Sequence, residues 1–248
     1  MINFRLSKYL HHWLYRVNEH SLHSPFFYDF YIKIIAKKYR KVIPISEEMK
    51  ILLKDSIVSG FHGEQPSEER LSIKTIINKI VKTKIASDKL ATFYLDLLHY
   101  FDVQKVIYIS TNINHTAVYL ANKENCKVFA FGENTTLSEE RFNNFSFFKG
   151  KIISSLSHFL ETSSKYEMIV MDVEGYGEIM NCFELLLRKM APKSIFVISD
   201  IHRSEEVEKA WMELKENPVV NASVDLFYCG ILIFNQDLRK QHYLFALT

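Results

Sequence analysis

The chain has 248 residues, of which 48% are hydrophobic, and a formal net charge of +2. These values indicate an ordinary globular protein, built as one large domain or as one domain with an appendage. Its three cysteines, Cys126, Cys182 and Cys229, lie far apart, which argues against a disulfide framework or a zinc site. No apolar run approaches the roughly 18 residues needed to cross a bilayer, and the N-terminus lacks the apolar core of a signal peptide, so we expect a cytoplasmic protein.

The first segment predicts two helices rich in aromatic and basic residues. Apolar residues recur at helical spacing from Leu6 to Val17, and Ser24-Pro25 is an N-cap and first-turn pair for a second helix that runs through Ile35. We therefore expect a helical hairpin. Residues 1–41 hold eight Lys or Arg against two acids, about +6 in all, so this segment suits nucleic acid, anionic lipid or an acidic partner, although a solvated basic face is the simpler interpretation.

The middle of the chain predicts a loop over 60–69, a helix that begins at Ser72, and another that begins at Ser87-Asp88 and runs through Leu98. From residue 105 short apolar runs alternate with helical patterns, which is typical of parallel βαβ units. We therefore divide the chain into a helical N-terminal extension, 1–86, and an α/β domain, 87–248.

The α/β domain is predicted to contain five parallel strands with helices between them. The strands are Val106–Ile109, Val128–Phe131, Phe145–Phe148, Met168–Met171 and Ile195–Ile198. The helices cover roughly 114–122, 136–143, 153–161 and 178–190.

An antiparallel hairpin is predicted after the fifth strand. Ser204 caps a helix that ends at Asn217-Pro218, and strict alternation from Val220 to Leu226 then predicts a half-exposed strand. Gly230 precedes a second strand, Ile231–Phe234, and two strands joined by so short a turn are antiparallel. The predicted fold class is therefore α/β, with five parallel strands, a C-terminal antiparallel hairpin and an N-terminal helical extension.

Three segments carry a resemblance to a known family: His23–Tyr31, Val197–Ser204 and Val224–Gly230. On these segments the chain resembles bacterial class I S-adenosylmethionine-dependent methyltransferase-like proteins with a helical N-terminal extension, over nearly its whole length. The resemblance implies a Rossmann-like sheet and S-adenosylmethionine as the cofactor.

The chain departs from this family after the first strand. Similar proteins have an acidic residue, a glycine and a second glycine four positions later, where this chain has Tyr108, Ser110 and Asn114. An acceptor for the cofactor's ammonium is lost, and Cβ atoms stand where glycine would let the cofactor approach. If each of these changes costs roughly 1 to 2 kcal/mol of binding free energy, a micromolar affinity for S-adenosylmethionine falls towards the millimolar range.

The resemblance also implies an acidic residue for the cofactor's ribose at the end of the second strand. Gly132 occupies that place and Glu133 follows it, so a shift of one residue would still present a carboxylate. An exposed glutamate in a turn is an equally good interpretation.

Acidic residues follow the fourth and fifth strands, at the edge where open α/β sheets bind ligands. Asp172, Asp200 and His202 are the candidate catalytic residues, with one of them as the base. Asp172, Glu174 and Asp200 offer oxygen ligands for a divalent cation, with His202 beside them, but Ser199 replaces an acid that the family often carries, so no metal is expected.

Three functions stay open. The first is a degenerate methyltransferase, or pseudoenzyme, that acts as a non-catalytic scaffold or ligand-binding protein, with a small molecule or a protein as partner and a homodimer through the N-terminal helices. The second is an active methyltransferase acting on a small molecule, with Ser110, Asn112 and Asn114 in place of the glycine backbone and Glu133 on the ribose. The third and least favoured is a nucleic-acid binder; a membrane partner is not expected.

Overall fold

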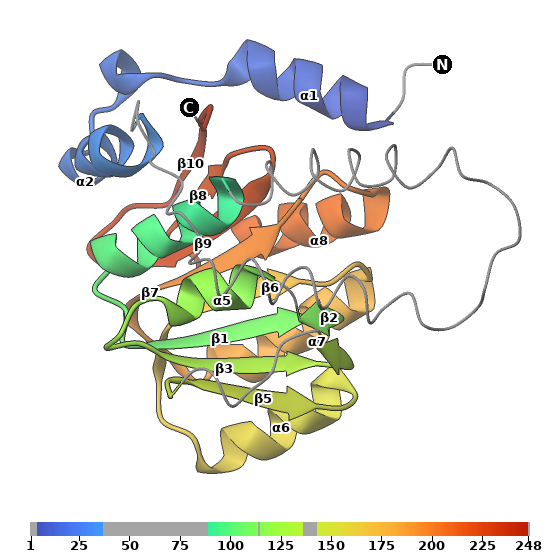
Figure 1. The fold of residues 1–248 in the computed structure, drawn as a ribbon. Coiled ribbons are helices and arrows are strands. Elements are labelled where there is room, and N and C mark those ends of the chain that lie inside the picture. Colours follow the sequence, from blue (N-terminus) through green and yellow to red (C-terminus); the bar gives the residue numbers. More distant parts are fainter. Residues whose placement is uncertain (1–3, 37–88, 114, 136–142, 248) are drawn as a thin grey trace, which may run out of the picture.

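The computed structural model describes residues 4–36, 89–113, 115–135 and 143–247 (Figure 1). The loop predicted over 60–69, the helix from Ser72, the cap at Ser87-Asp88 and nearly all of the helix predicted over 136–143 lie outside the described residues.

One mixed sheet of eight strands forms the centre of the described part. The strand order is β10-β8-β9-β7-β6-β1-β3-β5. The strands are β1 (Lys105–Ser110), β3 (Lys127–Gly132), β5 (Phe145–Lys149), β6 (Tyr166–Asp172), β7 (Met190–Ser199), β8 (Ala222–Asp225), β9 (Cys229–Phe234) and β10 (Gln241–Leu244). The five predicted parallel strands are confirmed as β1, β3, β5, β6 and β7.

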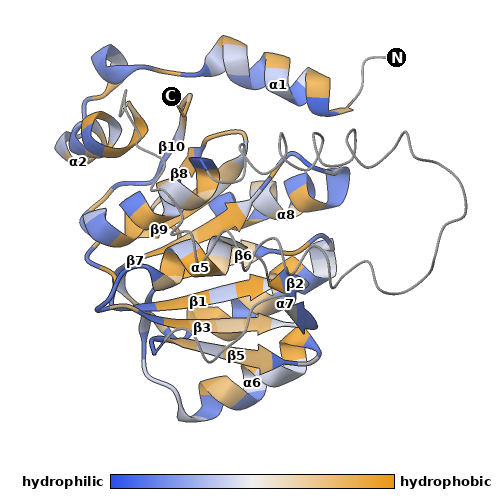
Figure 2. Cartoon of the chain, in the orientation of Figure 1, coloured by the Kyte–Doolittle hydropathy of each residue, from blue (hydrophilic) through white to orange (hydrophobic). Residues whose placement is uncertain are grey.

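Apolar side chains on both faces explain why the central strands are buried. In β1, Val106 and Tyr108 belong to one core cluster, whereas Ile107 and Ile109 belong to the other. Successive residues of a strand point to opposite faces, so a continuous apolar run builds two cores at once. Figure 2 shows the resulting apolar strands at the centre of the molecule.

Helices cover both faces of the sheet. A helix over 89–100 and α5 (His115–Ala121) pack on one face, and α6 (Ile152–Thr162), α7 (Tyr176–Leu187) and α8 (Glu205–Glu216) pack on the other. The predicted cap of α8 is confirmed, because the Ser204 hydroxyl accepts a hydrogen bond from the Val207 backbone N–H at 3.3 Å. Among the described residues no helix is long and apolar enough to span a membrane.

The C-terminal part confirms the predicted hairpin and adds one strand. β8 and β9 are antiparallel, and β9 is also antiparallel to β7. The added strand is β10, which was not predicted and pairs in parallel with β8 at the edge of the sheet. Its four residues, Gln-His-Tyr-Leu, show no clear alternation of apolar and polar side chains, so the pattern alone does not predict a strand.

The N-terminal helices are confirmed, but the predicted hairpin is wrong. α1 (Phe4–Tyr15) lies over the β8–β9 turn and α8, whereas α2 (Pro25–Phe30), extended by a π-helical turn (Tyr31–Ile35), packs into the core beside helix 89–100 (Figure 1). Phe27 and Phe30 are fully buried, and their burial draws α2 onto the sheet and away from α1.

Candidate functional site

The candidate site lies where the carboxyl ends of four parallel strands meet. β1 ends at Ser110, β3 at Gly132, β6 at Asp172 and β7 at Ser199, and Ser110 and Asp172 are partners in the parallel register. Open α/β sheets bind their ligands outside these ends. The described residues that were predicted for the cofactor and for catalysis, apart from the core residue Tyr108, therefore lie at this edge, in two neighbouring groups.

The loop that follows β1 is bonded to itself and to the loop after β3. The Ser110 hydroxyl donates a hydrogen bond to the Asn112 carbonyl at 3.0 Å. Two short strands, β2 (Asn112–Ile113) and β4 (Asn134–Thr135), pair in parallel, and the Glu133 N–H donates to the Thr111 carbonyl at 3.2 Å. This ribbon joins the two loops between which the resemblance puts the cofactor.

Gly132 explains how the two loops come so close. A Cβ atom on this residue would lie 2.3 Å from the Ser110 carbonyl oxygen and 3.1 Å from Ile113 Cγ1. Ile113 itself is only 1% exposed, so its side chain fills the space beside Gly132. Glycine at 132 therefore allows the backbone at the end of β3 to approach the backbone at the end of β1.

The other predicted cofactor residues have different surroundings. Tyr108 is buried in the core cluster that also contains Tyr94, so its side chain is a packing residue. Asn112 and Glu133 are exposed, and Asn114 lies outside the described residues. Burial, and then the nearby Glu133 carboxylate, raise the pKa of Glu178, so two carboxylates lie near each other beside this loop.

The acids after β6 and β7 are paired with arginines. Arg203 donates hydrogen bonds to the Asp172 carboxylate and, at 3.1 Å, to the Ser199 carbonyl, and its guanidinium lies 3.6 Å from Glu174. Asp200 accepts two hydrogen bonds from Arg5 of α1, at 2.9 and 3.1 Å. Neither arginine was predicted to belong to the site. The only sequence signal for Arg203 is its position next to His202, and Arg5 has none.

His202 lies in a second group, with Asp225 and Glu208. Its Nε2 is 3.0 Å from the Asp225 carboxylate, and its Nδ1 is 3.5 Å from Glu208. The Phe227 ring stacks on the imidazole at a centroid distance of 5.3 Å, with the Phe227 backbone in the left-handed region at φ 68°. Asp225 was predicted on the outward face of a strand, so its place at the site was not expected.

α1 adds His12 to this group. His12 Nε2 lies 3.2 Å from the Asp225 carbonyl oxygen, and the residue is only 5% exposed. Burial lowers the pKa of His12, and the attraction of Asp225 opposes this effect only in part. His12 is therefore held in its neutral form over a wider pH range than a free histidine.

The acids do not form a metal centre in the described part of the chain. No group of three or more His, Cys, Asp or Glu side chains there is arranged to hold a metal ion. Asp172 and Glu174 instead surround the guanidinium of Arg203, and Asp200 and His202 have partners of their own. Arginine side chains of this chain thus neutralise the carboxylates that were considered as ligands for a divalent cation.

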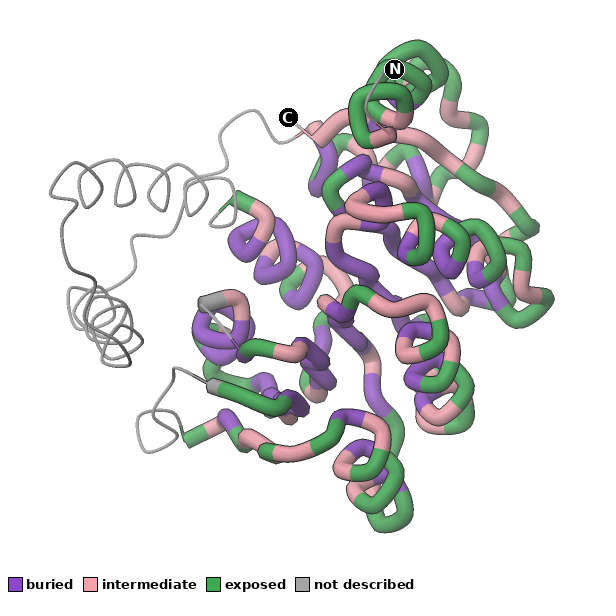
Figure 3. The backbone as a smooth tube through the Cα atoms, turned by 90° about the vertical axis from the view of Figure 1, so that its right-hand side faces the viewer, coloured by how far each residue is buried: buried purple, intermediate pink, exposed green. Residues whose placement is uncertain are grey.

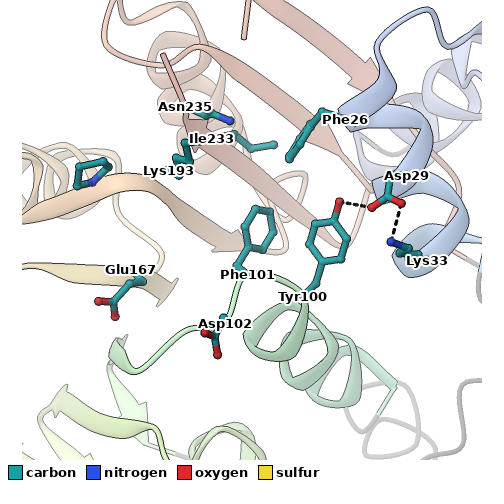
Figure 4. A pocket seen from close by; sticks show the side chains of 11 residues that line it. Phe26, Asp29, Lys33, Tyr100, Phe101, Asp102, Glu167, Lys193, Ile233 and Asn235 are labelled. Atoms are coloured by element: carbon teal, nitrogen blue, oxygen red, sulfur yellow. Dashed lines mark hydrogen bonds and ion pairs between the residues drawn. The ribbon is translucent and has the colours of Figure 1, made fainter. Parts of the chain in front are cut away.

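A separate hollow of about 510 Å³ lies at the opposite end of the sheet (Figure 4). Phe26 of α2, Tyr100 and Phe101 line one side of it. Two of its charged groups are paired with each other, since Lys33 lies 2.7 Å from Asp29, and the Tyr100 hydroxyl also donates to Asp29, at 2.9 Å. These two hydrogen bonds, first that of Lys33, lower the pKa of Asp29. The hollow takes no part in the site at the carboxyl ends.

Solved structures similar to this chain share its fold. A putative O-methyltransferase from Klebsiella pneumoniae matches with a TM-score of 0.56 at 11% identity, covering 78% of this chain and 92% of that one. The O-methyltransferase from Bacillus cereus in complex with SAH matches at 0.54 and 14%, over 78% and 92%. Cofactor-bound Rv0187 from MTB matches at 0.58 and 11%, over 80% and 94%.

No protein-family model matches the chain, and no curated protein matches its sequence. The structural matches nevertheless confirm the predicted fold: this chain has the class I methyltransferase fold, with helices added at its N-terminus.

Proposed function

We infer that this chain is a non-catalytic protein on a methyltransferase fold, acting as a scaffold or ligand-binding protein. The observation that carries the proposal is the ribbon of β2 and β4, which joins the loops after β1 and β3. In the usual pose the cofactor's adenosine lies between these loops, so binding would require the ribbon to separate and Ile113 to leave its buried position.

The state of the acids supports the same proposal. A general base must accept a proton from its substrate, and a carboxylate already bonded to a guanidinium is a poor acceptor. Asp172 is bonded to Arg203 and Asp200 to Arg5. His202 is only 6% exposed, and the Phe227 ring stacks on its imidazole, so a substrate has little access to it. The three candidate catalytic residues are thus held by other side chains of the protein.

Calorimetric titration with S-adenosylmethionine and with S-adenosylhomocysteine tests this function. We expect no saturable binding below about 1 mM. Opening the ribbon costs free energy, and this cost cancels much of what would be gained by burying the cofactor beside Tyr108. Binding tighter than about 50 µM would contradict the proposal. A variant with Ile113→Ala and Ser110→Gly should bind more tightly than the natural chain if these side chains obstruct the site.

An active methyltransferase is the second candidate, favoured by one observation. Glu133 is exposed at the end of β3, where a carboxylate suits ribose hydroxyls. In that case Glu133→Gln should weaken cofactor binding at least about tenfold, the loss expected for a charge-assisted pair of hydrogen bonds. Glu161→Gln, on the exposed surface of α6, is the matched control and should leave binding unchanged.

A further inference from the structure

α1 contacts the rest of the protein through its polar side chains. Arg5 is hydrogen-bonded to Asp200, and Lys8 Nζ lies 2.9 Å from the Glu208 carboxylate. His12 is the buried residue of the helix and lies against Asp225. An amphipathic helix on a globular protein usually buries its apolar face, so this orientation is reversed.

The apolar side of α1 is turned outward. Four side chains, which we name the outer stripe, have exposed fractions of 45% to 67%: Leu6, Leu10, Trp13 and Leu14. They follow the spacing of one helix face, and Figure 3 shows α1 as a mostly exposed element at the edge of the molecule. A contiguous exposed apolar face of this kind marks an interaction surface.

The charge beside the outer stripe indicates an anionic partner. The sequence from Phe4 to Val17 contains Arg5, Lys8 and Arg16 and no acidic residue. Arg5 and Lys8 are already ion-paired with the α/β domain, so Arg16 is the cation that lies beside the stripe. The Arg16 guanidinium lies 5.9 Å from the centroid of the exposed Trp13 ring, at the C-terminal end of the outer stripe. A partner for this surface must accept apolar side chains and positive charge together.

The size of the outer stripe argues against a second copy of the chain. Twelve residues make a helix about 18 Å long, and a face about 10 Å wide offers far less than the roughly 800 Å² per partner that a stable complex buries. A length of about 18 Å is likewise too short to cross the bilayer's hydrocarbon core of about 30 Å, so at a membrane the helix would lie in its plane.

We propose that α1 binds the surface of an anionic phospholipid bilayer. The outer stripe enters the boundary between head groups and acyl chains, where tryptophan and leucine side chains are favoured. Arg16 meets the lipid phosphates, and the ion pairs on the opposite side of α1 keep the α/β domain attached to the helix.

Vesicle co-sedimentation of the full chain tests this proposal. With mixed phosphatidylcholine and phosphatidylglycerol vesicles we expect binding, a blue shift of tryptophan emission, and weakening at high salt. Pure phosphatidylcholine should bind clearly less. Trp211 is 1% exposed, so the change in emission reports Trp13.

Two variants separate the outer stripe from apolar surface in general. Leu10→Ser combined with Leu14→Ser should lower vesicle affinity at least about tenfold, because two apolar side chains no longer enter the lipid. Met212→Ser is the matched control, since Met212 is 47% exposed but belongs to α8 and not to the outer stripe, and it should leave binding unchanged. Circular dichroism should show the same fold in both variants.

Three results would overturn the proposal. They are no binding to anionic vesicles, equal binding by the Leu10/Leu14 variant, and a dimer in sedimentation velocity that the Leu10/Leu14 variant abolishes. The last result would mean that a second copy covers the outer stripe.

Discussion

Gly132 cannot carry a side chain because the neighbouring strand's backbone is too near. The Ser110 carbonyl oxygen would lie 2.3 Å from an added Cβ, far inside van der Waals contact. This oxygen is a backbone atom, so it cannot move aside as the end of a flexible side chain could. The glycine at the position where the family resemblance implies an acidic residue is therefore explained by contact within this chain.

Gly132→Ala should destabilise the protein by about 1 to 3 kcal/mol, because β1 and β3 must move apart to admit the methyl group. Urea unfolding followed by circular dichroism measures this change. Gly177→Ala is the matched control: outside its chain neighbours and its own helix backbone no heavy atom lies within 4 Å of the added Cβ, and alanine favours the helix, so we expect stabilisation of about 0.5 to 1 kcal/mol. Equal stability of the natural chain and Gly132→Ala would mean that the two loops are not in contact in solution.

At the level of elements, α1 is attached by charged and polar contacts, so its attachment depends on pH. The pKa of His12 is lowered in the attached state, chiefly by burial, below the ordinary value of 6.5. A detached α1 would bind a proton first as the pH falls through 6.5, so attachment is strongest above that pH and weakens below it. Asp225 attracts the protonated imidazole, while His202 and Arg16 repel it.

Hydrogen exchange measures the attachment of α1 segment by segment. Protection of the amides of α1, corrected for intrinsic exchange rates, should fall as the pH is lowered below the ordinary histidine pKa of 6.5, while that of α7 stays constant. His12→Gln should remove this pH dependence, and His20→Gln, at an exposed position outside α1, should retain it. Protection of α1 that rises on acidification would contradict the assigned direction of the pKa.

The sequence predicted the parallel core well and the orientation of α1 poorly. Apolar runs such as Val106–Ile109 are buried on both faces. Such a strand can be predicted without knowing which of its faces is toward the core. In α1 the apolar spacing predicted a helix, but its orientation depends on Asp200, which is 195 residues away from Arg5. Periodicity within a helix carries no information about such a distant partner.

The candidate site was predictable only in part for a similar reason. Asp172 and Asp200 could be placed because parallel strands end at one edge of the sheet. Their neutralisation by Arg203 and Arg5 depends on where a loop and a distant helix lie. The ribbon of β2 and β4 has two residues in each strand, too few for any alternation to be recognised.

At the scale of the whole molecule, the described N-terminal helices and the C-terminal strand form one packed unit. The Val17 N–H donates to the Leu244 carbonyl at 2.8 Å. The Phe27 ring lies 4.5 Å from that of Tyr243, centroid to centroid, and Tyr31 lies 5.1 Å from Phe245. The N-terminal segment and the C-terminal strand therefore bury apolar rings against each other, although they are far apart in the sequence.

Phe245→Ala tests this joint packing, since the Phe245 side chain is fully buried among residues of α2, β10 and the sheet. We expect a loss of about 3 to 5 kcal/mol in the free energy of unfolding, with hydrogen exchange rising in α2 and β10 together. Val219→Ala, at a position 44% exposed, is the control and should change stability by less than about 0.5 kcal/mol. Increased exchange in β10 with unchanged protection of α2 would mean that the N-terminal helices are held by the sheet alone, without the C-terminal strand.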